Sequence, residues 1–240
     1  MCGVCELSDL RGGIVVKKAV ILLSGGLDST TCISYAISKG YEVYPISFDY
    51  GQRLSRELEC AKKVVEHFGI KTHRIIKMDN VGGSALTDMN ISVPNFEGDG
   101  GIPVTYVPAR NIIFLSYATG YAEVVGADCI FIGVNAVDYS GYPDCREEFI
   151  NAFQNMINIG TKRGVDGKPI KIETPLLHLS KGEIVKLATS VNAPLKYSTS
   201  CYNGKEKACG VCDSCTLRLR GFKEAGLIDP IPYENDANLK

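Results

Sequence analysis

The sequence predicts an α/β fold, a doubly wound parallel sheet followed by a small C-terminal zinc-binding knuckle. Three observations lead to this prediction. Short apolar segments alternate with amphipathic segments of helical length, which indicates a parallel sheet with helices on both faces. A glycine-rich turn joins the first apolar segment to the first helical segment. Four cysteines lie within fifteen residues near the C-terminus, and such clustering indicates a metal site rather than disulfides.

Strands and helices are expected to alternate along the chain. Apolar runs bounded by turn residues predict the strands, at 18–23, 42–48, 72–77 and 128–134. Periodic patterns predict the helices, at 29–38, 53–68, 111–125, 147–159, 181–190 and 216–225. Local signals suggest Asp28 or Ser29 as the N-cap of the first helix, Gly69 as the C-cap of the second, and Ser180 as the N-cap of the fifth. Segment 79–105 is rich in Gly, Pro, Asn and Asp, which predicts a long loop or lid.

Composition excludes several classes of protein. The chain has 240 residues, 45% of them hydrophobic, and 26 basic against 27 acidic side chains give a net charge of −1. This balance excludes a large sequence-independent interaction with nucleic acid that is driven by net charge alone, and a local basic patch stays open. The apolar runs fall short of the roughly 20 residues of a membrane span, and no apolar signal segment follows Met1. We therefore expect a soluble, cytoplasmic protein that binds neither a membrane nor a nucleic acid directly.

The turn after the first strand has the features of a phosphate-binding loop. It reads Ser-Gly-Gly-Leu-Asp-Ser at 24–29. Glycines allow backbone N–H groups to point at one anion, and the start of the following helix adds a partial positive charge. The loop lacks the Gly-Lys pair of a Walker A motif and the spacing of a dinucleotide-binding Gly-x-Gly-x-x-Gly motif.

Three further polar motifs are expected at the same edge of the sheet, where open α/β sheets bind ligands. One follows the second strand and contains Asp49, Tyr50 and Arg53. A second is the pair Arg110 and Asn111 at a helix start, which could bind a phosphate or a carboxylate, or in which Asn111 could be the N-cap. The third, in segment 133–147, suits a flat heterocycle. It combines aromatic, acidic and hydroxyl side chains, namely Asp138, Tyr139, Ser140, Tyr142, Asp144 and Arg146.

The C-terminal cysteines have the spacing of a metal site. They are Cys201, Cys209, Cys212 and Cys215. Four thiolates complete a tetrahedral zinc site. Spacing leaves an iron–sulfur cluster open, but no proline follows the last cysteine, so we favour one structural Zn²⁺ per chain. The scattered cysteines are expected to be small buried hydrophobes, and these are Cys32, Cys60, Cys129 and Cys145.

The loop at 24–29 resembles the fingerprint of the PP-loop ATP pyrophosphatases, which cleave ATP between its α and β phosphates. Together with segments 48–53, 107–111, 138–146, 173–176 and the cysteine tail, the chain resembles the 7-cyano-7-deazaguanine synthase (QueC) family from residue 17 to about 222. The resemblance implies a Rossmann-like, adenine nucleotide alpha hydrolase-like fold. We expect three parts: an N-terminal extension (1–16), a nucleotide-binding domain (17–195) and a zinc-binding segment with a helix (196–240).

The resemblance also implies a reaction. An ATP-dependent ligase of this family converts 7-carboxy-7-deazaguanine and ammonia into the nitrile, through an adenylated carboxylate and an amide. ATP with Mg²⁺ is the co-substrate; we expect AMP and pyrophosphate as products, although an ADP-forming course stays open. A homodimer is expected from the family.

The family's nucleotide loop transfers by position to residues 23–33 and its zinc ligands to the four C-terminal cysteines, and the other expected site residues come from the motifs described above. The catalytic set is Ser24, Asp28 and Ser29. The nucleotide-binding set is Leu23, Ser24, Gly25, Gly26, Leu27, Asp28, Ser29, Thr30, Thr31, Cys32, Ile33, Asp49 and Arg110. The substrate-binding set is Tyr139, Ser140, Tyr142, Asp144 and Arg146, and the zinc ligands are the four C-terminal cysteines.

Other interpretations stay open. A sibling enzyme would couple the activated carboxylate to another amine, for example on a protein, or would modify tRNA. A zinc-knuckle binding module with a vestigial phosphate loop is an alternative outside enzymes. The N-terminal Met-Cys-Gly-Val-Cys resembles the N-terminal cysteine of class II glutamine amidotransferases, but segment 1–13 is too short for that domain, and its role is left open.

Overall fold

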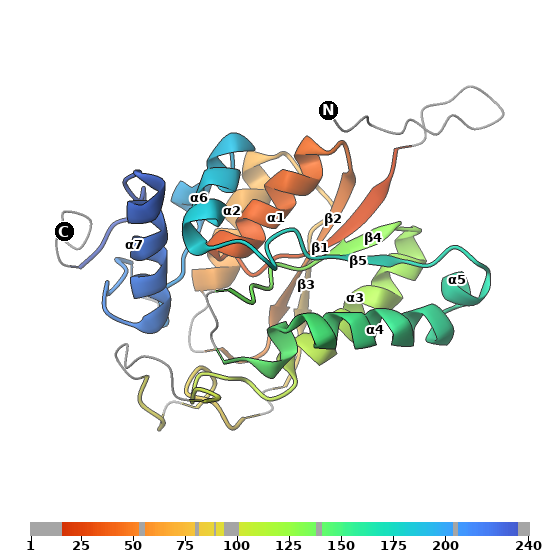
Figure 1. Ribbon diagram of the computed structural model, residues 1–240, viewed down its shortest axis with the longest axis horizontal. Coiled ribbons are helices and arrows are strands. Elements are labelled where there is room, and N and C mark those ends of the chain that lie inside the picture. Colours follow the sequence, from red (N-terminus) through yellow and green to blue (C-terminus); the bar gives the residue numbers. More distant parts are fainter. Residues whose placement is uncertain are drawn as a thin grey trace.

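A parallel sheet forms the centre of the structure (Figure 1). The computed structural model describes residues 16–52, 56–79, 82–88, 90–93, 101–137, 141–203 and 206–234. Within these residues the sheet has five strands in the order β3-β2-β1-β4-β5, all paired in parallel. They are β1 (Lys18–Leu22), β2 (Glu42–Asp49), β3 (Arg74–Lys77), β4 (Cys129–Phe131) and β5 (Lys171–Glu173). The chain winds one way from β1 to β3 and the other way from β4 to β5, so a crevice is expected at the carboxyl ends of β1 and β4.

Helices cover both faces of the sheet, which confirms the predicted doubly wound architecture. In Figure 1, the first group lies above the sheet and the second below it. The first group is α1 (Leu27–Ser38), α2 (Arg56–His67) and α6 (Lys181–Ser190), with α7 (Asp213–Ala225) packed against α6. The second group is α3 (Arg110–Val125) and α4 (Glu147–Gly160), and the short α5 (Lys162–Val165) follows α4. Two 3₁₀ turns are η1 (Pro143–Cys145) and η2 (Leu195–Tyr197).

The side chains of β1 show why both faces need a cover. Ala19 and Ile21 pack into one core with α1, α2 and α6, whereas Val20 and Leu22 pack into the other with α3 and α4. All four are buried, because successive side chains of a strand point to opposite faces and both faces here are apolar.

Most elements begin and end within three residues of the predicted bounds. Ser180 caps α6 and forms a capping box with Glu183, as predicted. The N-cap prediction for α1 is wrong: Gly26 holds that position, because the Ser29 hydroxyl turns back into the loop. The alternative that Asn111 is only an N-cap does not hold, since Ala109 precedes α3 and Asn111 lies inside it.

The sequence did not predict β5 or α5, which are three and four residues long. The described parts of segment 79–105 contain turns but no helix or strand, in agreement with a long loop. The three-part division at 16/17 and 195/196 stays a prediction; residues 1–15 lie outside the described residues, and Phe222 of α7 shares a core with Ile184 of α6. None of the described helices is long and apolar enough to cross a membrane.

Candidate functional site

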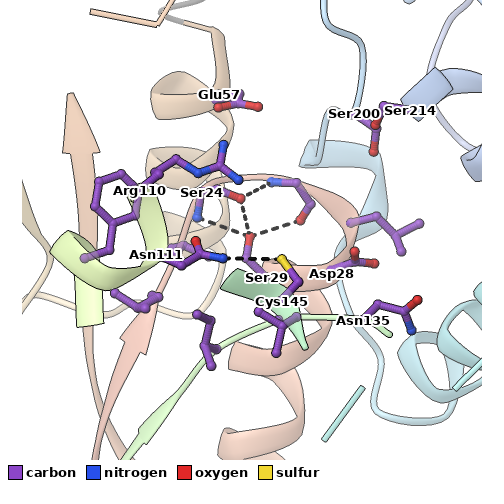
Figure 2. A pocket seen from close by; sticks show the side chains of 18 of the residues that line it. Ser24, Asp28, Ser29, Glu57, Arg110, Asn111, Asn135, Cys145, Ser200 and Ser214 are labelled. Atoms are coloured by element: carbon purple, nitrogen blue, oxygen red, sulfur yellow. Dashed lines mark hydrogen bonds between the residues drawn. The ribbon is translucent and has the colours of Figure 1, made fainter. Parts of the chain in front are cut away.

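A pocket of about 300 Å³ opens at the carboxyl ends of β1, β2 and β4 (Figure 2). The loop after β1, residues 132–135 after β4 and the start of α3 form its floor and one side. Residues 199–202, Lys181 of α6 and Arg218 of α7 complete the opposite side. The pocket therefore lies at the crevice that the strand order creates.

Two serines shape the phosphate loop. The Ser29 hydroxyl accepts the backbone N–H groups of Ser24 and Gly25, each at 3.2 Å, and lies 3.0 Å from the Ser24 hydroxyl. The Ser24 hydroxyl in turn accepts the N–H of Gly26 at 3.2 Å. Figure 2 shows these bonds as a closed group at the start of α1. The loop is held in one conformation by its own side chains before any ligand binds.

Gly25 is the one loop position where a side chain cannot fit. Its φ is +88°, and a Cβ there would lie 2.2 Å from the Glu57 carbonyl oxygen and 2.7 Å from the Ala61 nitrogen. Gly26 has a φ of −78°, and its Cβ would meet nothing closer than the Ser24 hydroxyl at 3.3 Å. The first glycine lets α2 pack directly on the loop; the second is not required in this way.

Gly25→Ala is therefore expected to lower stability by about 2 kcal/mol or more, since it combines a left-handed φ with a backbone clash. Gly26→Ala adds the same methyl group and is the matched control, with an expected loss of less than half as much. Thermal unfolding measures both, and about 2 kcal/mol corresponds to roughly 4–8 °C in Tm for a chain of this size. Equal losses would contradict the assignment of the close contact to Gly25.

Lys181 forms an ion pair with Asp28 inside the pocket. Its ammonium group lies 3.2 and 3.1 Å from the two carboxylate oxygens, and the two side chains are 12% and 30% exposed. Gly221 of α7 allows this placement, because a Cβ there would lie 2.6 Å from Cγ of Lys181. Sequence analysis missed Lys181: it is 153 positions from Asp28, and its local context shows only a helix start.

Aromatic and charged side chains form the side of the pocket near β2. Arg110 donates to the Tyr50 hydroxyl at 3.4 Å, and its guanidinium lies 5.9 Å from the centre of the Tyr142 ring. Burial opposes the charge of Arg110, but the two tyrosine hydroxyls outweigh it and raise its pKa. Burial also raises the pKa of Glu57, against the opposing effect of Arg110. A permanent cation therefore faces the pocket on this side.

Segment 141–146 supports the start of α3 as well as the pocket. The buried carboxylate of Asp144 accepts the backbone N–H of Asn111 at 3.0 Å, and the Asn111 side chain donates to the Asp144 carbonyl at 3.0 Å. Tyr142 lines the pocket, whereas Arg146 is exposed and donates to the Pro143 carbonyl. Cys145 differs from the buried cysteines that the sequence predicted, because it is partly exposed and lines the pocket.

The predicted site residues therefore fall into three groups. Those that line the pocket are Leu23, Ser24, Gly26, Leu27, Asp28, Ser29, Tyr50, Arg110, Asn111 and Tyr142. Those described elsewhere, in the loop backbone, the buried face of α1, the end of β2 or segment 141–146, are Gly25, Thr30, Thr31, Cys32, Ile33, Asp49, Asp144 and Arg146. Arg53, Asp138, Tyr139 and Ser140 lie outside the described residues.

The four C-terminal cysteines come together as predicted. Their sulfur atoms lie within 4.8 Å of one another, and all four residues are buried. A tetrahedral Zn²⁺ with Zn–S bonds of about 2.3 Å needs sulfur atoms about 3.8 Å apart, so the set fits such an ion. The N–H groups of Asn203 and Cys209 donate to the Cys201 sulfur at 3.3 Å each. Hydrogen bonds among the thiols lower the pKa of Cys201 and raise the pKa of Cys212 and Cys215, so without a metal a single negative charge is concentrated on Cys201.

Comparison with known proteins gives a consistent result. The model of the family described as queuosine biosynthesis protein QueC matches residues 18–226. A 7-cyano-7-deazaguanine synthase of Acetivibrio thermocellus is 71% identical over 218 residues, which is 91% of this chain and 98% of that protein. Proteins of the same name from Desulfitobacterium hafniense and Coxiella burnetii are 65% and 54% identical, over 93% and 91% of this chain and 96% and 98% of theirs. The structure of an NMN synthetase from Francisella tularensis is a much weaker match, at 15% identity and a TM-score of 0.49 over 93% of this chain and 81% of that one.

Proposed function

This chain belongs to the QueC family of queuosine biosynthesis proteins, and from that membership we propose that it forms 7-cyano-7-deazaguanine, the product for which its relatives are named. It is an ATP-dependent ligase that converts 7-carboxy-7-deazaguanine and ammonia into the nitrile. The observation that carries this proposal is the convergence of the phosphate loop, the Asp28–Lys181 pair and Arg110 on one pocket.

The substrate carboxylate needs activation, because its leaving group would otherwise be oxide. A carboxylate oxygen attacks the α-phosphorus of ATP, the bond to the bridging oxygen of the β-phosphate breaks, and pyrophosphate leaves. Ammonia then displaces AMP to give the amide and releases a proton. The amide oxygen attacks a second ATP in the same way, and loss of one N–H proton gives a neutral imidate adenylate. Loss of AMP together with the second N–H proton then leaves the nitrile. Each cycle activates a different group on the same carbon.

The pocket residues have roles that this course requires. The N–H groups of the first turn of α1, from Leu27 to Ser29, have no acceptor within the helix and bind the departing pyrophosphate, and Lys181 and Arg110 offset its charge. Asp28, the acidic side chain of the loop, would hold the Mg²⁺ that accompanies ATP, which shares the phosphate charge. The protein binds and orients the reactants and stabilises charge, and the mechanism requires no covalent intermediate on the enzyme.

The deazapurine is proposed to bind near segment 138–146. Tyr142 supports this placement because it lines the pocket beside Arg110. Tyr139 and Ser140 are kept as proposed contacts. Asp144 and Arg146 stay predicted substrate contacts. The hydrogen bond of Asp144 to Asn111 favours a role in fixing the start of α3, which carries Arg110.

Three further expectations are kept as proposals. The four-cysteine cluster holds one structural Zn²⁺, which its buried thiols and their spacing support. The chain acts as a cytoplasmic homodimer, as the family resemblance and the sequence features suggest. It binds no nucleic acid directly, which the net charge of −1 supports.

The test uses purified protein with ATP, Mg²⁺, 7-carboxy-7-deazaguanine and ammonium, and follows the products by mass spectrometry. We expect the nitrile, with the amide appearing transiently and AMP accumulating; ADP in place of AMP would contradict the adenylate. An amide that is never converted further would favour an enzyme that couples the carboxylate to another amine. If zinc-loaded, folded protein consumed no ATP in response to the deazaguanine, the ligase assignment would be wrong.

A further inference from the structure

Segment 198–202 connects the four-cysteine cluster to the phosphate loop. It begins at the end of η2 and contains the first metal-binding cysteine, Cys201. Three of its residues line the pocket: Thr199, Ser200 and Tyr202. The backbone N–H of Thr199 donates to the Gly25 carbonyl at 2.9 Å. The segment therefore contacts the loop glycine that leaves no room for a side chain.

Arg218 holds the first part of this segment. The side chain is 1% exposed and pairs with Asp229 through two bonds, Nε to Oδ2 at 2.6 Å and Nη2 to Oδ1 at 2.9 Å. Its Nη1 donates to the Ser198 hydroxyl at 2.9 Å and to the Ser200 hydroxyl at 3.4 Å. The planar guanidinium thus binds Asp229 on one side and segment 198–202 on the other, which a lysine ammonium could not do with the same geometry.

The cysteine cluster holds the other end. Cys201 is the fourth residue of the segment, and Cys215 lies one turn before Arg218 on α7. A metal ion bound by these sulfur atoms would attach the segment to α7, the helix to which Arg218 also attaches it. Without the ion, the segment would keep one of its two attachments to α7 while still bonded to Gly25.

We propose that metal occupancy of the four-cysteine cluster sets the affinity of the phosphate loop for ATP, with segment 198–202 as the connection and Arg218 as its positioning residue. The proposal rests on the proposed function, because it takes ATP to bind at the loop. It gives the cluster a second role beyond stability. By thermodynamic reciprocity, a nucleotide on the loop must then strengthen zinc binding by the same factor.

The first test measures this reciprocity in the unaltered protein. The probe is α,β-methylene ATP with Mg²⁺, which cannot be cleaved at the α–β position, and zinc affinity is measured by competition with a chromogenic chelator. We expect the apparent zinc affinity to rise at least fivefold with the analogue bound. An unchanged zinc affinity, with the analogue shown to bind, would refute the coupling and leave the proposed function intact. If zinc-loaded protein did not bind the analogue at all by calorimetry, the nucleotide site and this proposal would both be wrong.

The second test addresses Arg218 in the zinc-loaded protein. Arg218→Lys keeps the positive charge beside Asp229 but removes the guanidinium N–H group that donates to Ser198. We expect the affinity for the analogue to fall at least fivefold, and KM for ATP to change more than kcat, with one zinc per chain still bound. Arg220→Lys is the matched control, since Arg220 lies on the same helix, is 59% exposed and pairs with Glu224. Equal affinities in the two variants would rule out a positioning role for Arg218.

A third variant tests the contact with the loop directly and does not alter the buried ion pair. Thr199→Pro removes the N–H that reaches Gly25, and the ψ of 157° at Ser198 is compatible with a following proline. Thr199→Val keeps the N–H and removes only the hydroxyl. We expect the proline variant to bind the analogue at least fivefold more weakly than the valine variant, with the same zinc content. Identical binding would show that segment 198–202 does not act on the loop.

Discussion

Asp28→Asn is expected to lower kcat by about 10²–10³-fold, with zinc content and Tm close to those of the unaltered protein. Asparagine has nearly the same shape, so the start of α1 is retained. It removes the negative charge that is proposed to hold Mg²⁺, and it leaves the Lys181 ammonium in the pocket without its ionic partner. Steady-state kinetics with saturating ATP measures the loss.

Asp128→Asn is the matched control for this substitution. Asp128 precedes β4 at the amino ends of the strands, away from the pocket. Its carboxylate accepts the N–H of Lys18 and lies 3.6 Å from Arg163. That variant should keep its kcat. A kcat for Asp28→Asn within threefold of the unaltered value would contradict the role of the carboxylate.

A double-substitution cycle measures whether Asp28 and Lys181 contribute to kcat together or independently. If Asp28 and Lys181 act as a unit, Lys181→Met should cost less in the Asp28→Asn background than in the unaltered protein. Strict additivity would mean that the two residues contribute independently, and that the ion pair seen in the pocket is not part of the catalytic arrangement.

The parts of the site that could be predicted from the sequence are those whose functional residues lie close together along the chain. The phosphate loop lies within six residues, and the cysteines lie within fifteen, so their residue types and spacing carry the chemistry without knowledge of the fold. The same holds for α6, whose capping box is local. β5 was missed because an edge strand of three residues with two charged side chains has little apolar signal.

Lys181 and Arg218 could not be predicted, because their roles depend on distant partners. Two arginines two residues apart on one helix look equivalent in the sequence, yet Arg218 is 1% exposed and Arg220 is 59% exposed. Asp144 is the opposite case. Its residue type and position in the loop predicted a contact with the heterocyclic substrate, but in the fold its carboxylate accepts the backbone N–H of Asn111. The surroundings of Lys181 and Arg218 depend on the packing of α7 against α6, and those of Asp144 depend on the packing of α3 against η1.

Arg218→Met is expected to destabilise the protein by about 3–5 kcal/mol, because it leaves the Asp229 carboxylate buried without its cation. Asp229 is 3% exposed, and it also accepts hydrogen bonds from the Tyr233 hydroxyl and the Ile231 N–H. For a chain of this size the loss corresponds to a fall in Tm of roughly 6–20 °C. Arg220→Met removes an exposed pair with Glu224 and should cost at most about 1 kcal/mol.

The source of this loss can be tested by removing the stranded charge. Arg218→Met combined with Asp229→Asn should recover part of the stability, since a neutral amide is less costly to bury than a carboxylate that has lost its guanidinium partner. A double variant no more stable than Arg218→Met would place the loss in the bonds to Ser198 and Ser200 instead. Because those bonds attach segment 198–202 to α7, the double variant should still bind α,β-methylene ATP weakly even as its Tm recovers. Stability and nucleotide affinity would then separate, as expected if Arg218 has both a structural and a positioning role.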